Sequence, residues 1–181
     1  MPTLIEPTVA VHRSFLAAWD EFGPDDERWM GARAISGDEE EWSREQAADP
    51  DEFARMVELI RIEADPATEL RPDLVHQTVL WFVDGQEWLG RLSIRHDLTP
   101  VLIELGGHIT YGVRPSARHH GHATRMLTQS LPIAAGLGID PVLVTCDLDN
   151  VGSRKVIQAA GGELEDERHG KLRFWVPTHV A

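Results

Sequence analysis

Most of the information about the fold lies in residues 113–123, which read Val113-Arg114-Pro115-Ser116-Ala117-Arg118-His119-His120-Gly121-His122-Ala123. An apolar, strand-like run ends here at a proline, and a segment with helical spacing begins after the glycine. A strand end, a turn and a helix start therefore follow one another. The first amides of a helix have no partner inside it and lie at the positive end of its dipole. The stretch predicts a site for an anion, in particular a pyrophosphate, at a helix N-terminus.

The residue types in this turn suit that interpretation. Gly121 and Ala123 are small enough for phosphate oxygens to approach the backbone, and positive character comes from Arg118, His119, His120 and His122. An ordinary strand-to-helix turn with a capping glycine remains the alternative. The Walker loop G-x-x-x-x-G-K-[ST] and the Rossmann loop G-x-G-x-x-G are both absent, so those two classes of nucleotide site are excluded.

The chain before this turn changes from helical to strand-like spacing. Ser14 is positioned to cap a helix over Phe15–Phe22, and Asp51–Ala64 carries a helical stripe of apolar residues. The runs Thr78–Val83 and Trp88–Ile94 flank Asp84-Gly85, a strong hairpin signal. The run Val101–Val113 follows, and its Gly106-Gly107 pair predicts a long strand with a bend. The order is helices first, then sequential strands.

The chain after this turn alternates between the two periods. A helix is predicted over Ala123–Ala135, with a kink or an early break at Pro132. We then expect a strand over Pro141–Cys146, a helix over Val151–Ala160, and a hairpin of Leu164–Arg168 with Lys171–Val176. The order predicts a mixed α/β (α+β) domain with one central sheet.

Length and composition limit the possible classes. The 181 residues, 42% hydrophobic and 26% charged, fit one globular domain over residues 1–181. A net charge of −13 argues against binding nucleic acid or an anionic membrane, and it weakly favours a cationic partner. The lone cysteine, Cys146, the lack of a secretory pattern and the absence of a long apolar run predict a soluble, cytoplasmic protein. A last strand ending at Val180-Ala181 suggests a homodimer.

Residues 113–123 resemble the signature V-x-P-x-x-[RQ]-x-x-G-x-[GA] of the GNAT superfamily of acetyl-CoA-dependent N-acetyltransferases. The matching residues are Val113, Pro115, Arg118, Gly121 and Ala123. Downstream, Asn150-Val151-Gly152-Ser153 resembles the N-x-x-[AS] helix opening of the family. The resemblance implies a mixed, mostly antiparallel sheet of six to seven strands, with strands 4 and 5 splayed apart and helices on both sides. It also implies a helical acceptor-side region over residues 1–75 and an acetyl-CoA-binding core over residues 76–181.

The resemblance assigns binding residues for the co-substrate. Backbone amides from Arg118 to Ala123, with His119, His120, Gly121 and His122 between them, are expected to hold the pyrophosphate of acetyl-CoA. Gly112, Val113 and Arg114 are expected to pair with the pantetheine arm in strand fashion. Asn150 is expected to reach either the same arm or the adjacent strand, and Ser153 is expected among the residues that bind the co-substrate. The reaction implied is direct attack of an amine on the thioester carbonyl, with no metal ion.

The sequence departs from the family at the general acid. Many members have a tyrosine seven residues after the helix asparagine, where this chain has Ile157. Tyr111 is the only tyrosine, and it can replace the missing acid if its hydroxyl faces the fork between strands 4 and 5. Otherwise it is a packing residue. His108 and Glu104 are the candidate bases, with His108 slightly preferred.

Other residues carry weaker predictions. Cys146 is read as a small buried residue rather than an acyl carrier, and the turn histidines as unsuited to a metal site. Trp81, Phe82 and Trp88 are predicted in the core, whereas Trp19, Trp29 and Trp42 are expected either to pack or to line an acceptor pocket. The leading function is acetyl transfer to a primary amine of a small molecule or protein. A CoA-binding sensor without turnover and an acyltransferase with another acyl group or acceptor are the alternatives.

Overall fold

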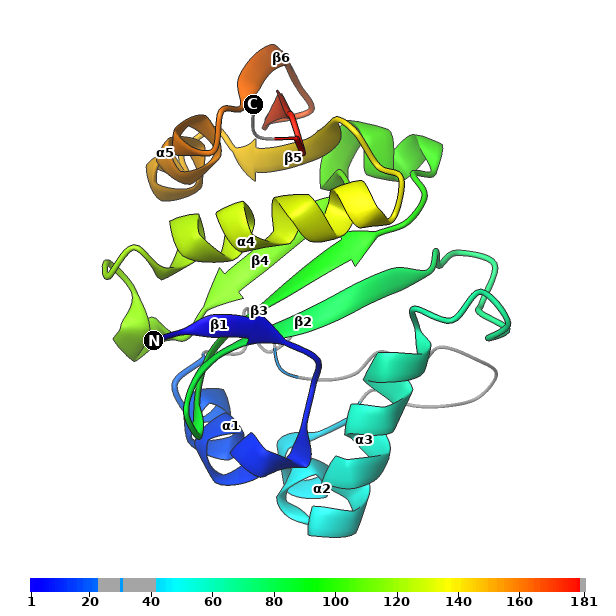
Figure 1. The fold of residues 1–181 in the computed structure, drawn as a ribbon, viewed down its shortest axis with the longest axis vertical. Helices are drawn as coiled ribbons and strands as arrows, with labels where there is room; N and C mark the ends of the chain where they lie inside the picture. Colours follow the sequence, from blue (N-terminus) through cyan, green and yellow to red (C-terminus); the bar gives the residue numbers. More distant parts are fainter. Residues whose placement is uncertain (23–29, 31–41, 180–181) are drawn as a thin grey trace.

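A seven-stranded sheet is the centre of the computed structural model, which describes residues 1–22, 30 and 42–179 (Figure 1). Its spatial order is β1-β2-β3-β4-β5-β7-β6. The strands are Thr3–Ile5 (β1), Gln77–Asp84 (β2), Glu87–Arg95 (β3), Ile109–Val113 (β4), Val142–Asp147 (β5), Glu163–Arg168 (β6) and Lys171–Val176 (β7). Only β4 and β5 pair in parallel; the other neighbours are antiparallel. The predicted mixed, mostly antiparallel sheet is confirmed.

Helices cover both faces of this sheet (Figure 1). One face carries α1 (His12–Trp19), α2 (Arg44–Ala48) and α3 (Pro50–Ile62), and the other carries α4 (His122–Gly136) and α5 (Val151–Ala159). Because side chains alternate along a strand, Trp81 and Phe82 of β2 enter opposite cores. The Trp81 ring stacks on Phe15 of α1 with centroids 5.0 Å apart, while Phe82 packs in the cluster that contains Met126 of α4.

One local prediction about a helix is wrong, and one of the two alternatives predicted for another helix does not occur. The first helix begins at His12, and Ser14 lies inside it, where its hydroxyl accepts a 2.9 Å hydrogen bond from the Trp88 amide instead of capping the helix. The early break at Pro132 does not occur, since α4 continues to Gly136. Leu131 and Ala134, on either side of the proline, are buried in the core, and this packing holds the helix together across the missing amide.

The single long strand predicted over Val101–Val113 is also wrong. Residues Leu102–Gly106 form a π-helix (η3), and β4 begins only at Ile109. Side chains from elsewhere hold the carbonyls of this turn: Arg173 donates to Ile103 O at 2.7 Å, and Thr145 donates to Leu105 O at 3.0 Å. The apolar pattern of the segment fits a strand, but these long-range hydrogen bonds favour the helical turn.

The strands β4 and β5 meet at one end and then separate. Their only ladder pair is Ile109 with Val144, next to a 2.7 Å hydrogen bond from the His108 amide to Leu143 O. Gly107 has φ +65°, and a Cβ placed on it would lie 2.4 Å from Leu143 O. Only glycine fits this approach. The predicted splay between strands 4 and 5 is confirmed, and it opens from this contact.

The turn after β4 is tied to Glu21, which follows the end of α1. Arg114 Nε donates to a carboxylate oxygen of Glu21 at 2.7 Å, and the Ser116 amide and hydroxyl donate to the same carboxylate at 2.9 and 3.0 Å. Partial burial raises the pKa of Glu21, but the hydrogen bonds from Arg114 and Ser116 outweigh it and hold that pKa below its ordinary value. The ion pair fixes the start of the turn.

The last described strand, β7, lies inside the sheet between β5 and β6. The premise of the homodimer, a final strand with an open side, is therefore wrong for Lys171–Val176, and Val180-Ala181 lie outside the described residues. The dimer itself stays a prediction. In the described ranges, no helix has both the length and the apolar character needed to cross a membrane.

Replacing Gly107 with alanine should destabilise the fold by about 2–4 kcal/mol, because a Cβ there collides with a backbone oxygen and needs a strained φ. Gly136→Ala, at a helical position with open space around it, is the control. It should leave the free energy of unfolding unchanged or raise it by about 0.5–1 kcal/mol. Urea unfolding measures both, and equal effects would contradict the close approach.

Replacing Glu21 with glutamine should destabilise the protein by about 1–3 kcal/mol at pH 7, because Arg114 loses its charged partner. The folded pKa of Glu21 lies below the unfolded value of 4.5, so its stabilisation is present above pH 4.5 and is lost as the pH falls through the folded pKa. The difference from the wild type should therefore shrink in acid. Glu87→Gln is the control, since that exposed carboxylate lies 3.8 Å from the same guanidinium. A pH-independent difference in urea unfolding would refute the linkage.

Candidate active site at the fork between β4 and β5

Two pockets meet where β4 and β5 separate. The amide pocket, of about 550 Å³, lies between β4, the turn after it, α4 and α5. The fork pocket, of about 450 Å³, lies between β3, β4, the π-helix, β5 and β7. Three residues line both of them: Tyr111, Asn150 and Ser153. These three side chains therefore lie between the two pockets.

The amide pocket contains most of the residues predicted to bind acetyl-CoA. Those lining it are Gly112, Val113, Arg118, His119, Gly121, His122, Ala123, Asn150 and Ser153. Arg114 and His120 do not line it. The Arg114 side chain turns to Glu21, and His120 Nδ1 lies 2.8 Å from the Arg118 carbonyl in the turn.

The N-terminus of α4 faces the amide pocket without a side-chain cap. Gly121 is the N-cap residue, with φ +75°, and no acidic residue occupies the first turn of the helix. A Cβ at Gly121 would meet no atom within 4 Å, so the backbone here is open to a ligand. Free first-turn amides and a small capping residue are the features that an anion site at a helix N-terminus requires.

The nitrogen-containing side chains of His122 and Arg118 lie beside these amides. His122 packs its ring near Phe82, with centroids 5.5 Å apart, and its buried Nδ1 has no hydrogen-bond partner in the described part of the chain. Burial, with a smaller effect from Arg125, lowers the pKa of His122. Arg118 Nε donates to the Val113 carbonyl at 3.2 Å.

Within residues 1–22, 30 and 42–179, no three His, Cys, Asp or Glu side chains gather closely enough to hold a metal ion.

The edge of β4 that faces the fork is the predicted contact for pantetheine. β4 pairs with β3 along its whole length, but its pairing with β5 stops at Ile109. Gly112 and Val113 therefore present their β5-facing side to the amide pocket. A strand edge of this kind can bind an extended chain through its backbone groups.

Asn150 has a local structural role. Its Oδ1 accepts a 2.9 Å hydrogen bond from the Ser153 amide and so caps α5. This cap holds Ser153 at the fork. Ile157, at the position where many family members have tyrosine, is completely buried in the core, so that position of α5 contributes nothing to the fork.

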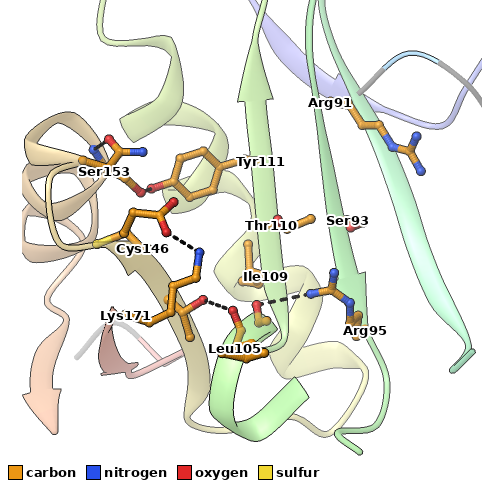
Figure 2. A pocket seen from close by; sticks show the side chains of 14 residues that line it. Arg91, Ser93, Arg95, Leu105, Ile109, Thr110, Tyr111, Cys146, Ser153 and Lys171 are labelled. Carbon is orange, nitrogen blue, oxygen red and sulfur yellow. Dashed lines mark hydrogen bonds and ion pairs between the residues drawn. The ribbon is translucent and has the colours of Figure 1, made fainter. Parts of the chain in front are cut away.

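Tyr111 and Ser153 form a hydroxyl pair at the junction of the pockets (Figure 2). Tyr111 extends from β4 and Ser153 from α5, and their oxygens are 2.7 Å apart. Burial raises the pKa of Tyr111 to about 12, and the hydrogen bond with Ser153 offsets part of that effect. Either hydroxyl can donate to the other. At neutral pH, the hydrogen of the remaining hydroxyl can then be donated to a third group.

The two candidate bases lie outside the lining of both pockets. His108 Nδ1 accepts a 2.8 Å hydrogen bond from the Leu143 amide, which requires that nitrogen to be unprotonated. Burial, with a smaller effect from Arg95, lowers the pKa of His108. Its position beside the strand junction gives it a structural role.

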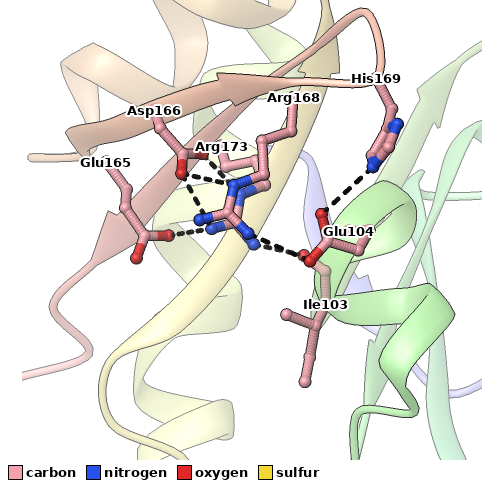
Figure 3. Close-up of polar contacts among 7 residues, drawn as sticks. All are labelled: Ile103, Glu104, Glu165, Asp166, Arg168, His169 and Arg173. Atoms are coloured by element: carbon pink, nitrogen blue, oxygen red, sulfur yellow. Dashed lines mark hydrogen bonds and ion pairs between the residues drawn. The ribbon is translucent and has the colours of Figure 1, made fainter.

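Glu104 belongs to the π-helix rather than to a strand. Its carboxylate is held by Arg168 at 3.2 Å and lies 3.6 Å from His169 Nε2 (Figure 3). This ion pair joins the π-helix to the β6–β7 hairpin, where Arg173 binds both Glu165 and Asp166 at 2.7 Å. Glu104 and His108 each contact structural partners, and neither lines a pocket with the Tyr111–Ser153 pair.

The fork pocket contains polar residues that the sequence analysis did not single out. They are Arg91, Ser93, Arg95, Thr110, Thr145, Asp147 and Lys171. The signal that could have found the first three is their alternation with Gly90, Leu92 and Ile94 along β3, because a polar face on a central strand needs something to face.

The cysteine and the tryptophans pack as expected. Cys146 is buried, and burial raises the pKa of its thiol, which disfavours the thiolate that acyl transfer needs. The prediction that Trp81, Phe82 and Trp88 lie in the core is confirmed. Trp19 and Trp42 are also buried, while Trp29 lies outside the described residues.

Several solved structures that are similar to this chain are named as acetyltransferases. The chain is similar to Mycobacterium smegmatis RimJ in complex with CoA-disulfide, with a TM-score of 0.66 and 16% identity over 97% of this chain and 81% of that one. It is similar to the Microcin C7 self immunity acetyltransferase MccE in complex with acetyl-CoA and AMP, with a TM-score of 0.62 and 13% identity over 97% and 92% of the two chains. The ribosomal-protein-S5-alanine acetyltransferase from Vibrio fischeri gives a TM-score of 0.58 and 14% identity over 97% and 90%. These identities establish the fold alone.

A comparison with curated protein sequences gives no match. The family model described as an acetyltransferase (GNAT) domain, in contrast, matches residues 19–163, which is most of the chain. That match covers the strand end, the turn, the uncapped start of α4 and the N-cap of α5 on which the two pockets are built. The protein therefore belongs to the GNAT acetyltransferase family.

Proposed function

We propose that this protein is an acetyl-CoA-dependent N-acetyltransferase that acetylates a primary amine of a small molecule or a protein. The observation that carries the proposal is the meeting of the amide pocket and the fork pocket at the Tyr111–Ser153 pair. One pocket offers uncapped helix amides for the phosphates of CoA. The other offers space for an acceptor on the far side of the reacting group.

The amide pocket supplies the binding part of this function. Residues 118–123 would hold the pyrophosphate through the amides at the start of α4, and the open edge of β4 would bind the pantetheine arm. Similar structures were solved with acetyl-CoA or a CoA-disulfide bound, which supports the same co-substrate here. The thioester would then lie at the fork, where β4 and β5 no longer pair.

The fork supplies the chemical part. The amine nitrogen attacks the thioester carbonyl, a C–N bond forms and the C–S bond breaks, and the proton lost by the amine is balanced by one gained at sulfur. In this proposal, Tyr111 or Ser153 would donate a hydrogen bond or a proton to the departing sulfur. The described lining of the fork pocket holds one carboxylate, Asp147, which is paired with Lys171. Holding both reactants close together where the two pockets meet supplies the rest of the rate enhancement.

Acetyl-CoA at about 100 times its dissociation constant should raise the melting temperature by about 5–10 °C, because binding at that level adds about 2.7 kcal/mol. Gly121→Glu should abolish the shift, since it places an anion where the phosphates bind. Gly138→Glu is the matched control at the other end of α4, with φ +79° against +75° and equally open surroundings. It should keep the shift. No shift in the wild type would refute the proposal.

Replacing Tyr111 with phenylalanine, or Ser153 with alanine, should lower kcat by about 10- to 100-fold and change the dissociation constant of acetyl-CoA by less than about 3-fold. Release of CoA thiol with a reactive amine measures kcat, and calorimetry measures binding. Cys146→Ala, at another residue of the same pocket, should keep kcat within about 3-fold. Full activity of the Tyr111→Phe and Ser153→Ala variants would remove the hydroxyl pair from the mechanism. Binding without turnover in the wild type would favour a CoA-binding module.

A further inference from the structure

The fork pocket contains a primary amine of the protein itself. The chain has two lysines, Lys155 and Lys171. Lys171 lines the fork pocket, whereas Lys155 is an exposed residue of α5 that lines neither pocket. A lysine side chain ends in the functional group that the proposed reaction acetylates. One amine of this chain is therefore placed in the pocket assigned to the acceptor.

The start of β7 holds Lys171 in this position. In the register of β5 with β7, Lys171 lies directly opposite Asp147. Its ammonium donates a hydrogen bond to the Asp147 carboxylate, which lines the same pocket. The Lys171 side chain is 27% exposed, so a molecule in the pocket can contact it. The ion pair thus fixes an accessible amine in the wall of the fork pocket.

Lys171 and the hydroxyl pair share this pocket. Figure 2 shows Lys171 extending from β7 toward Tyr111. Cys146 is electrostatically coupled to both side chains: burial raises the pKa of its thiol and the charge of Lys171 opposes part of that rise. Burial, with a smaller contribution from Cys146, raises the pKa of Tyr111. The thioester that the proposed function places beside Tyr111 would therefore lie near the lysine.

We propose that Lys171 is a self-acetylation site, at which the ε-nitrogen takes the acetyl group from acetyl-CoA bound to the same molecule. The inference rests on the proposed function and adds a modification site to it. The ammonium loses a proton, for which the Asp147 carboxylate is an acceptor already in place, and the nitrogen attacks the thioester carbonyl. A C–N bond forms, the C–S bond breaks, and the sulfur gains a proton. The products are Nε-acetyllysine, CoA thiol and one released proton.

Self-acetylation changes the charge of the pocket wall. An acetylated lysine is a neutral amide and can no longer form an ion pair. Asp147 would lose the partner that it has on β7, and the added acetyl group would occupy part of the fork pocket. The modified protein would therefore offer an incoming amine a smaller and more negative pocket.

Mass spectrometry of the full chain incubated with acetyl-CoA tests the proposal, with Lys155 as the internal control. Spontaneous acetylation by dissolved acetyl-CoA favours Lys155, because it is the more exposed amine. Transfer inside the fork reverses this order, and Lys171 should be modified at least about 10-fold faster. The modified fraction at a given time should not change over about a ten-fold dilution of the protein, since the reaction is intramolecular. Digestion after glutamate keeps the peptides independent of lysine modification.

Three variants locate the reaction. Gly121→Glu should abolish the preference for Lys171, because the donor no longer binds, and Gly138→Glu, at the other end of α4, should keep it. Lys171→Arg keeps a positive partner for Asp147 but has no amine that reacts, since a guanidinium stays protonated. It should gain no acetyl group at position 171 and should keep the rise in melting temperature with acetyl-CoA. That rise shows that the variant is folded and binds the donor.

The outcomes separate the two proposals. If acetyl-CoA raises the melting temperature but Lys171 is modified no faster than Lys155, self-acetylation is overturned and the proposed function stands. Modification of Lys171 in Gly121→Glu at the wild-type rate, or a modified fraction that falls on dilution, also overturns it, because the acetyl group then comes from solution or from another molecule. If acetyl-CoA does not raise the melting temperature of the wild type, the proposed function is refuted and the inference falls with it.

Discussion

The sheet has two parts, and they join at the backbone contact between Gly107 and Leu143. Strands β1 to β4 form one antiparallel part and β5, β7 and β6 form the other, and the parallel ladder between them has a single pair at Ile109 and Val144. A glycine is required because the backbone of one part approaches the backbone of the other too closely for a Cβ. If β4 and β5 paired over more residues beyond this contact, β5 would close the edge of β4 and the fork would disappear. If it were absent, the two parts would have only their helices and the π-helix to hold them together.

The sequence was informative wherever the structure is determined by short-range signals. The Asp84-Gly85 turn, the apolar face of Asp51–Ala64 and the helix predicted over Val151–Ala160 are local patterns, and the structure has a hairpin, a packed helix and a helix over Val151–Ala159 at these places. The same is true of the uncapped start of α4, because glycine before a helix and the lack of an acidic first turn can be read directly.

Sequence patterns failed where distant groups decide the outcome. The residues around Glu104 read as a strand, but Arg173 and Thr145, far along the chain, bind the carbonyls of this segment and stabilise a π-helix instead. His108 is a candidate base by residue type and stays a prediction, but only the fold shows that its Nδ1 accepts a hydrogen bond from the Leu143 amide.

The internal position of β7 has a consequence for how the protein is made. β5 is synthesised before β7 but needs β7 as its antiparallel neighbour, since β6, which comes between them in the sequence, pairs only with β7. During translation, the first part of the sheet can fold as soon as it leaves the ribosome, while β5 waits with one edge open until the chain through Val176 has emerged. Lys171, on that same strand, is among the last described residues to take its place, so the residues of the amide pocket are synthesised before the fork pocket is complete.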